Sequence, residues 1–458
     1  MQLRNIFLNC WKSENGFLKH SPIGALAANL PSMHKPFFIF IAFCLTTIAK
    51  GQIDIKTFVK ENAISIATIQ PDSTNYEDLI EIGKAIGDSK IVMLGEQDHG
   101  DAPTFLAKTR LIKYLHEKKG FNVLAFESDF FGLNIGWDNL PKNESAIDTF
   151  LRKNIFPIWT YCDACQDLFY TTIPNSYKTG NPITISGFDN QLYLRYSSLK
   201  LSSKFDSVIK KLSLPISLTA DYSTTILPLI DSISRVSIIN KDTIFYNLLL
   251  DKFKIIKSEL ITKVDANNFW ILVLDNFISL TIELKFYKSD YYKSRNSRDV
   301  QMAKNLKWLS NIKFPNEKII VWAHNYHISK YGGNFTPKFL NQAITMGTEF
   351  TKDSILLKST YILGFTSNTG SAGRLTMDNK TYKVQKSVKN GFENWIPSDF
   401  NYSFIDFKNY NNFHPNNAEE FNMKASLTGG HRNLSAQWTN IFDGIFYIKE
   451  MYPCSLIK

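Results

Sequence analysis

Residues 91–100 read IVMLGEQDHG, and this stretch decides how the fold is interpreted. Its first four residues are apolar, which predicts a short buried strand that stops at Gly95. An acid, Glu96, follows the glycine directly, and an imidazole, His99, comes three residues later. Ligands bind beyond the carboxyl ends of strands in open α/β sheets. The stretch therefore predicts a strand end that carries a reactive site.

Two further apolar runs end in the same way. Residues 123–126, VLAF, run directly into Glu127. Residues 319–323, IIVWA, run into His324, and His327 follows three residues later. Three strand-like runs that each end in an acid or a histidine indicate an enzyme.

The segment between the first two runs predicts a helix over residues 103–119. Pro103 suits a first helical turn, and Lys118, Lys119 and Gly120 are typical of a helix end. A strand, a helix and a second strand in this order favour a parallel sheet. Residues 183–186 are a further candidate strand. The expected fold class is α/β, with a mainly parallel central sheet flanked by helices.

The remaining chain predicts one large domain over residues 52–458. Residues 52–76 are expected to form a linker and a first turn, followed by a helix over 77–86. About residues 197–288 contain no glycine and show helical periodicity, which predicts an inserted helical bundle or cap. A helix over 298–312 leads into the third apolar run. The pattern then favours strands over residues 360–366, 374–384, 402–407 and 445–448.

Residues 1–51 form a leader that indicates export. Residues 33–51 begin with a basic start, continue with a short apolar stretch and end in small residues, which predicts a signal peptide. The apolar stretch is shorter than the ~20 residues of a membrane-spanning helix. We expect the mature protein to lie in the periplasm or outside the cell, without stable membrane insertion after cleavage. Met33 is an alternative start to Met1.

Composition is that of a globular protein with a large core. The chain has 458 residues, of which 44% are hydrophobic and 21% charged, and this excludes wholesale disorder. The formal net charge is +10, and part of it belongs to the leader. Basic arms that would grip phosphates are missing, so the sequence argues against nucleic acid as a partner.

Five cysteines are present, and three of them lie beyond the leader. Cys162 and Cys165 have the CxxC spacing of a redox pair, half a zinc site or a short-range disulfide. The sequence has no second cysteine pair to complete a zinc site. In an exported protein, a local disulfide or two idle thiols is the expectation.

The first two strand ends predict a histidine base. Glu96 is close enough in sequence to orient His99, and Glu127 is placed to reach both from the neighbouring strand. A carboxylate selects the tautomer of an imidazole and raises its basicity. Such a pair could take a proton from water as it attacks a carbonyl carbon. The alternative is a hydrogen-bonded polar network that closes the end of the sheet.

The third strand end offers two interpretations. His324 and His327 could ligate a metal together with Glu96 or Glu127, because two histidines and a carboxylate are a common ligand set. They could also stabilise a developing oxyanion. The structural alternative is that backbone carbonyls satisfy both rings. Lys108, on the helix after His99, either adds positive charge to the site or is a solvated lysine.

Several familiar catalytic motifs do not occur in the chain. The sequence has no G-x-S-x-G, no G-x-G-x-x-G and no G-x-x-x-x-G-K-[ST]. A serine hydrolase with a nucleophile elbow and enzymes that use dinucleotides or a P-loop therefore lack support. Water-activating or metal-assisted hydrolysis remains.

An ordered set of motifs resembles the erythromycin esterase family over about residues 75–450. They are Gly95-Glu96-x-x-His99-Gly100, Lys108-x-Arg110-Leu111, Gly120-Phe121 before the strand ending at Glu127, Arg298-Asp299-x-x-Met302-Ala303-x-Asn305-Leu306-x-Trp308-Leu309, Trp322-Ala323-His324-Asn325-x-His327, and Phe442-Asp443-Gly444-Ile445-Phe446.

The resemblance implies hydrolysis of a macrolide lactone ring, and hence antibiotic resistance. It also implies a mechanism without a cofactor or metal, in which His99 activates water and is held by Glu96 or Glu127. Lys108 would line the site as a substrate-binding residue, and His324 and His327 would stabilise charge on the carbonyl oxygen. The expected partner is a small-molecule ester or lactone.

One segment departs from the family pattern. After residues 156–159, where the family usually has an Arg-Asn-x-Glu pattern, this chain has residues 162–165, CDAC. If the lost arginine and glutamate contact substrate, the substrate is a different ester. Two other hypotheses use the same residues: a metal-dependent hydrolase, and a non-catalytic protein that binds haem, a metal or a polysaccharide.

Overall fold

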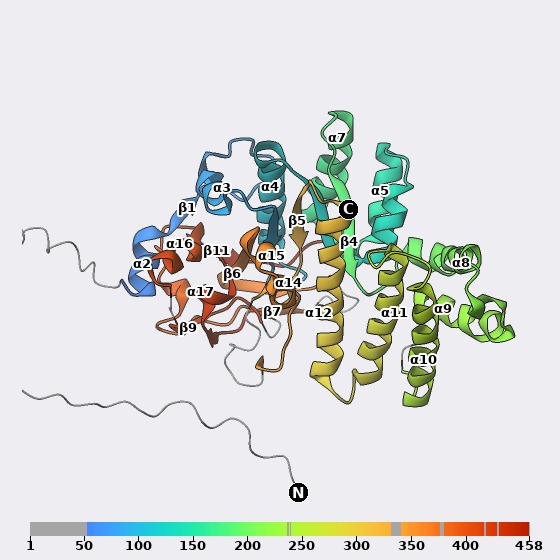
Figure 1. Cartoon of the computed structure of the whole chain (residues 1–458). Helices are drawn as coiled ribbons and strands as arrows, with labels where there is room; N and C mark the ends of the chain where they lie inside the picture. The colour runs from blue at the N-terminus through green and yellow to red at the C-terminus, as the bar shows by residue number, and fades with distance from the viewer. Residues whose placement is uncertain are drawn as a thin grey trace, which may run out of the picture. The chain divides into compact units, whose positions relative to one another are not determined.

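The computed structural model describes residues 53–457, except residues 236, 237, 239, 331–339, 376–379, 416, 417, 428 and 429 (Figure 1). The signal peptide expected over residues 33–51 lies outside the described residues. Among the described helices, none is both long enough and apolar enough to cross a membrane.

A large mixed sheet forms the centre of the described domain. Its strand order is β1-β8-β11-β6-β2-β5-β3-β4, and β7 pairs with the far part of β6. The parallel strands are β11 (Gly444–Met451), β6 (Thr360–Gly373), β2 (Ile91–Leu94), β5 (Lys318–Trp322), β3 (Phe121–Asp129) and β4 (Thr184–Asp189). The antiparallel strands are β1 (Ile64–Ile66), β8 (Tyr402–Asp406) and β7 (Thr381–Lys383). The expected α/β fold with a mainly parallel sheet is confirmed.

Helices cover both faces of this sheet, and the strands bury alternate residues against each. In β2, Val92 and Leu94 pack in the same apolar cluster as Phe105 of α4 (Ala102–Lys119). Ile91 and Met93 instead join the cluster of α12 (Tyr291–Trp308) on the other face. This two-residue alternation explains why all four residues of β2 are buried and apolar.

The helix α4 links β2 to β3 as the βαβ pattern predicts. Pro103 occupies its first turn. Gly120 ends it in the left-handed region, with φ at 73°, where glycine has no steric penalty. The helix therefore begins and ends where its sequence signals predict.

The strand register brings the three strand ends together. Leu94 of β2 and Phe126 of β3 both pair with Trp322 of β5. Glu96, Glu127 and His324 follow these three residues by one or two positions. The sheet thus places their backbones side by side at one edge.

A helical region follows β4. It comprises α8 (Arg195–Lys211), α9 (Leu227–Ser234), α10 (Thr243–Leu260), α11 (Phe269–Phe286) and then α12. The helices α8 to α11 share an apolar cluster of their own, which also takes in Phe130 and Phe131 just after β3, and Trp308 of α12 packs against it. In Figure 1 they extend from the β4 side of the sheet.

Two sequence expectations are wrong in detail. The segment 52–76 is not only a linker, because it forms α2 (Ile55–Asn62) and then β1, which pairs with β8. The strand expected over residues 374–384 is confined to β7, and β6 extends to Gly373 instead. A three-residue strand is held by its partner in the sheet, and a single sequence gives no sign of that partner.

The other elements are short. They are α3 (Ile80–Ile86), α5 (Glu144–Asn154), α6 (Pro157–Thr160), α7 (Ile173–Lys178), α13 (Asn325–Ile328), α14 (Met346–Thr351), α15 (Ser354–Lys358), α16 (Phe407–Phe413), α17 (Trp438–Ile441), β9 (Phe421–Met423) and β10 (Leu434–Ala436).

Candidate active site

Gly95 allows the first strand end to approach the third. A Cβ atom at this position would lie 1.9 Å from the Oδ1 atom of Asn325. The Asn325 side chain in turn accepts a hydrogen bond from the Phe365 N–H at 3.1 Å and donates to the Phe365 carbonyl at 2.8 Å. The glycine is therefore required by close packing, and the loop that carries Glu96 and His99 is fixed against β6.

Glu96 is the centre of a fully buried cluster. Its Oε1 lies 2.6 Å from Nδ1 of His99 and accepts a hydrogen bond from Nε1 of Trp159 at 3.1 Å. Its Oε2 lies 2.7 Å from Nζ of Lys108. Burial alone would raise the pKa of Glu96, but the Lys108 ammonium and His99 outweigh it and hold the pKa below its ordinary value. Glu96 is thus an ionised carboxylate.

Lys108 is buried, so its interpretation as a solvated lysine is wrong. Its ammonium lies 3.8 Å from the centre of the Trp322 ring and forms the ion pair with Glu96. Burial lowers the pKa of Lys108, and the Glu96 carboxylate opposes that shift. Lys108 therefore neutralises the charge of Glu96 and does not face solvent.

His99 is the accessible histidine of the cluster. Because Glu96 accepts the Nδ1 proton, the neutral ring carries its lone pair on Nε2. The side chain is 16% exposed, whereas that of its partner Glu96 is fully buried. The ring also packs edge-on against Trp159, with 5.5 Å between the centroids. An oriented imidazole with an available nitrogen is suited to act as a base.

His324 is a neutral ring whose two nitrogens are both engaged. Its Nδ1 accepts the Tyr326 N–H at 3.0 Å, so its Nε2 donates to the Gln97 carbonyl at 2.9 Å. Burial and the nearby His99 and His327 rings lower the pKa of His324 to about 3. Its centroid lies 5.3 Å from that of His99. His324 thus packs against the base and locks the loop at Gln97.

His327 belongs to a buried ionic network. Its Nδ1 lies 2.8 Å from Asp299, and its Nε2 lies 3.2 Å from Oε1 of Glu127. Burial would lower the pKa of His327, but the carboxylates of Asp299 and Glu127 outweigh it and raise the pKa. Glu127 also accepts the His324 backbone N–H at 3.0 Å and an Arg298 N–H at 2.8 Å.

Within the described part of the chain, the site histidines and carboxylates are not among the groups with metal-ligand spacing. Among the described residues, the one cluster with metal-ligand spacing is Cys162, Asp163 and Cys454, and its two cysteines are disulfide-bonded to each other. Both nitrogens of His324 have hydrogen-bond partners, which leaves no lone pair for an ion. The geometry gives no support to the hypothesis that His324 and His327 ligate a metal with Glu96 or Glu127.

Comparison with known proteins identifies the family. The family model for erythromycin esterase matches residues 271–451, a segment that includes Arg298, His324 and His327. A putative hydrolase of Bacillus subtilis (strain 168), YbfO, is 25% identical over 413 residues, which cover 85% of this chain and 90% of that protein. The carboxyl-terminal part of this chain thus matches the erythromycin esterase family. Erythromycin esterase type II of Escherichia coli is 32% identical over a shorter stretch of 102 residues, which covers 22% of this chain and 24% of that protein.

Solved structures share the fold of this chain. A Bacillus cereus protein has a TM-score of 0.66 at 16% identity, over 88% of this chain and 98% of that one. A succinoglycan biosynthesis protein has a TM-score of 0.66 at 19% identity, over 90% and 100% of the two chains. A mutant erythromycin esterase in its open conformation has a TM-score of 0.63 at 16% identity, over 86% and 99%.

These similarities support an erythromycin-esterase-like hydrolase, and the structure adds residues that the sequence motifs did not assign to the site. Trp159, which donates to Glu96, lies in the short helix α6, in a segment with no catalytic motif. Asp189 follows a predicted strand and holds Arg298 through two hydrogen bonds, at 3.0 and 2.7 Å. Arg298 and Asp299, which stand in the motif quoted for the family, were a usable signal: both are buried, and each pairs with a charged or titratable side chain of another element.

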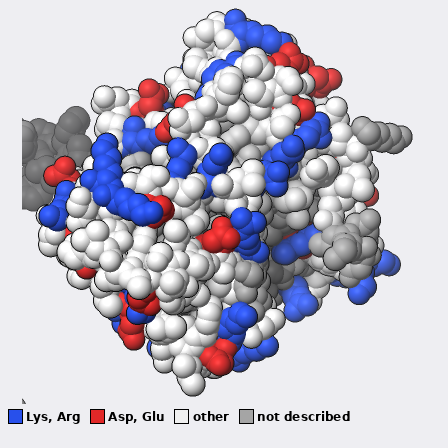
Figure 2. All heavy atoms as spheres, turned by 90° about the vertical axis from the view of Figure 1, so that its right-hand side faces the viewer, with Lys and Arg blue, Asp and Glu red and all other residues white. Residues whose placement is uncertain are grey.

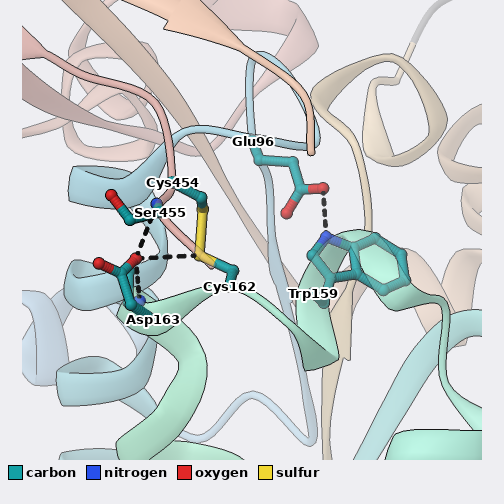
Figure 3. The surroundings of a disulfide bond; sticks show 7 residues. Glu96, Trp159, Cys162, Asp163, Cys454 and Ser455 are labelled. Carbon is teal, nitrogen blue, oxygen red and sulfur yellow. Dashed lines mark hydrogen bonds between the residues drawn. A yellow bond between two sulfur atoms is a disulfide. The ribbon is translucent and has the colours of Figure 1, made fainter. Parts of the chain in front are cut away.

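The cysteines of this hydrolase pair differently from the expectation. Cys162 bonds to Cys454, 292 residues away, and Cys165 is a buried free thiol whose pKa is raised by burial. The local disulfide is therefore wrong. Figure 3 shows the Cys162–Cys454 bond close to the segment that carries Trp159, whose indole points at Glu96. Asp163 also forms hydrogen bonds with the backbone of Ser455. These bonds attach the segment around Ser455 to residues 159–165, which we call the site loop.

Proposed function

We propose that this hydrolase cleaves a carboxylic ester with a water molecule that His99 activates. The observation that carries the proposal is the Glu96–His99 contact of 2.6 Å at the joint end of three parallel strands. Glu96 is ionised and buried, and His99 is the partly exposed member of the pair. This is the arrangement that general-base catalysis requires.

The reaction would proceed through a tetrahedral intermediate. Nε2 of His99 takes a proton from water as the water oxygen bonds to the ester carbonyl carbon. Glu96, hydrogen-bonded to Nδ1, stabilises the imidazolium, as the carboxylate of a catalytic triad does. The intermediate then breaks its carbon–oxygen bond, and His99 returns the proton to the leaving alcohol.

The remaining predicted site residues, Glu127, His324 and His327, lie around the Glu96–His99 pair. Glu127 interacts electrostatically with His99, and this interaction lowers the pKa of Glu127. The Glu127 carboxylate therefore also favours the protonated form of His99. Asp299 and Glu127 raise the pKa of His327, so a protonated His327 ring would add positive charge near His324, whose ring centroid lies 6.3 Å away. The ring N–H groups of His324 and His327 already have acceptors, so neither ring offers a free donor to the carbonyl oxygen.

A macrolide lactone is the first substrate class to test. The similarity to the Escherichia coli erythromycin esterase supports it. Residues 162–165, where the family pattern changes, hold the Cys162 end of the disulfide beside the site. This difference supports an ester of another class as the alternative.

We also propose that the protein works outside the cytoplasm, in the periplasm or beyond the cell. The leader composition supports export, and so does the Cys162–Cys454 disulfide, because disulfides persist in oxidising compartments. Amino-terminal sequencing of the mature protein from the periplasmic and culture fractions tests this. An intact leader on protein confined to the cytoplasm would contradict it.

The function is tested by mass spectrometry of macrolides and simple esters after incubation with the protein. We expect one substrate to gain a water molecule, and His99→Ala to lower the rate by about 10²–10⁴-fold. A suitable control is His414→Gln, because His414 stacks on Tyr410 away from the cluster. Full activity of folded His99→Ala would overturn the mechanism, and hydrolysis that a chelator abolishes would favour a metal enzyme.

A further inference from the structure

A second feature of the molecule lies directly beside the candidate base. A cavity of about 810 Å³ is lined by Arg374, Lys380, Lys383, Arg432, Tyr382 and Asp98, with His431 in its wall. Asp98 is the residue before His99, and its Oδ1 accepts the His99 backbone N–H at 2.8 Å. A residue of the cavity wall is therefore the direct sequence neighbour of the proposed base. A cavity of this volume is in the range that holds small-molecule ligands.

The lining of this cavity is strongly cationic. It carries four basic side chains and one carboxylate. That carboxylate, Asp98, already accepts hydrogen bonds from Arg374 and Tyr382. Burial would raise the pKa of Asp98, but the Arg374 guanidinium outweighs it and lowers the pKa, so the two charges offset each other. Lys383 and Arg432 add positive charge to the cavity lining.

The charged side chains of the cavity lining are mainly of one sign. On the face shown in Figure 2, basic side chains stand in separate groups with acidic ones among them. A concave site lined by one sign of charge focuses its field and attracts ligands of the opposite sign. The charge of the cavity thus favours an anion.

Buried side chains outside the cavity lining hold His431, which is part of the cavity wall. Nε2 of His431 lies 3.0 Å from Asp101, and its Nδ1 lies 2.7 Å from Oγ of Ser367. All three side chains are buried. Lys383 stands on β7, which is paired to β6 opposite Ser371. Such support keeps a binding site ordered before the ligand arrives.

We propose that this cavity binds an anionic group of the substrate, so that the preferred substrate is an ester carrying a second, ionised acidic group. The inference rests on the proposed esterase function. Arg374 and Arg432 are the groups that grip carboxylates and phosphates through paired N–H donors. An anion held here lies beside Asp98, the sequence neighbour of His99, and the ester bond of the same molecule would extend from the cavity to the base.

The test compares two esters that differ in one carboxylate: 4-nitrophenyl butyrate and the mono-4-nitrophenyl ester of glutaric acid. We expect kcat/KM for the acidic ester to exceed that for the neutral one by about tenfold or more, and the ratio to fall with added salt. In the double variant Lys383→Glu/Arg432→Glu the ratio should fall to about one or below. Lys56→Glu/Lys60→Glu, on exposed positions of α2, is the matched control and should keep the ratio.

Binding is measured separately, so that catalysis does not decide it. Calorimetry of folded His99→Ala protein with glutarate and with inorganic phosphate should show at least tenfold weaker binding when the two cavity substitutions are added. The anion that binds more tightly, glutarate or phosphate, indicates whether the acidic group of the substrate is a carboxylate or a phosphate. Equal kcat/KM values for the two esters in the wild type would overturn the inference and leave the esterase intact.

If neither ester is hydrolysed, the proposed function fails for simple esters and calorimetry decides the cavity. Glutarate and phosphate binding that is absent, or unchanged by the cavity substitutions, would overturn the anion site. Circular dichroism of each variant establishes that a loss of binding does not come from unfolding.

Discussion

At the scale of single residues, the site depends on keeping one buried carboxylate ionised. Glu96 has no contact with solvent, and it would lose its charge there without compensation. Lys108 supplies that compensation at 2.7 Å, and Trp159 adds a neutral donor at 3.1 Å. His99 can then be oriented by a full negative charge and need not share a proton with it. The lysine therefore acts on the base through Glu96.

Replacing Lys108 with methionine tests this role. The variant leaves Glu96 buried without its cation, so the pKa of Glu96 should rise and its hold on His99 should weaken. We expect kcat/KM to fall about 100-fold and the free energy of unfolding to fall by about 3 kcal/mol, the cost of breaking a buried pair. Lys118→Met, at an exposed position near the end of the same helix, should change neither. Wild-type kinetics in a folded Lys108→Met protein would contradict the argument.

At the scale of elements, the sequence predicted what local patterns determine. The strand over residues 91–94 matches β2 because four consecutive apolar residues between a polar segment and Gly95 suit few other places. Parallel neighbours then bring Glu96, Glu127 and His324 to one edge as a consequence of the fold. Local sequence patterns did not predict the contacts between segments that are far apart in the chain.

The pairing of Cys162 with Cys454 shows why. CxxC spacing makes the two nearest cysteines look like partners, but the end of β11 returns the chain to the site loop across 292 residues. The same limit applies to Trp159 and to β1, whose partners Glu96 and β8 are set by tertiary packing. Spacing along the chain therefore predicts that Glu96 and His99 form a pair. The residues that hold this pair in place, such as Trp159, become visible only in the structure.

Removing this disulfide tests how far the site loop depends on it. Cys162→Ala/Cys454→Ala should lower the free energy of unfolding by about 2–5 kcal/mol, because the bond closes a long loop. Activity should fall as well, since Trp159 lies three residues from Cys162 and holds Glu96. Thermal unfolding and ester kinetics measure the two effects. Cys165→Ala, which removes the buried free thiol and keeps the bond, is the control. A double variant that loses stability but keeps full activity would show that the loop holds its position unaided.

At the scale of the whole molecule, one ionic network joins the helical region to the sheet. Arg298 of α12 binds Asp189 at the end of β4 and Glu127 of β3. His327, after β5, bonds to Asp299 of the same helix. Four elements from distant parts of the chain thus meet through buried charges. The network holds the strand ends in register, so its charge state matters for stability as well as for chemistry.

The pH dependence of folding follows from Glu127. Burial would raise its pKa, but His327 and Arg298 outweigh burial and hold the pKa well below its ordinary value. A carboxyl whose pKa is lower in the folded than in the unfolded state stabilises the fold above the unfolded value of about 4.3, and loses that contribution as the pH falls below it. Glu127→Gln should therefore cost about 3 kcal/mol at neutral pH, the cost of breaking a buried pair.

The difference between wild type and Glu127→Gln should then narrow as the pH is lowered, because the wild type loses what the variant already lacks. Urea unfolding of both proteins at about pH 7, 5 and 3.5, values on either side of the ordinary glutamate pKa, measures this difference. Glu144→Gln, which removes an exposed ion pair with Lys178, should cost about 1 kcal/mol or less at every pH. A gap between Glu127→Gln and wild type that stays constant down to the lowest pH would mean that the carboxylate charge contributes nothing. The loss would then come from packing at the meeting point of β3, β5 and α12.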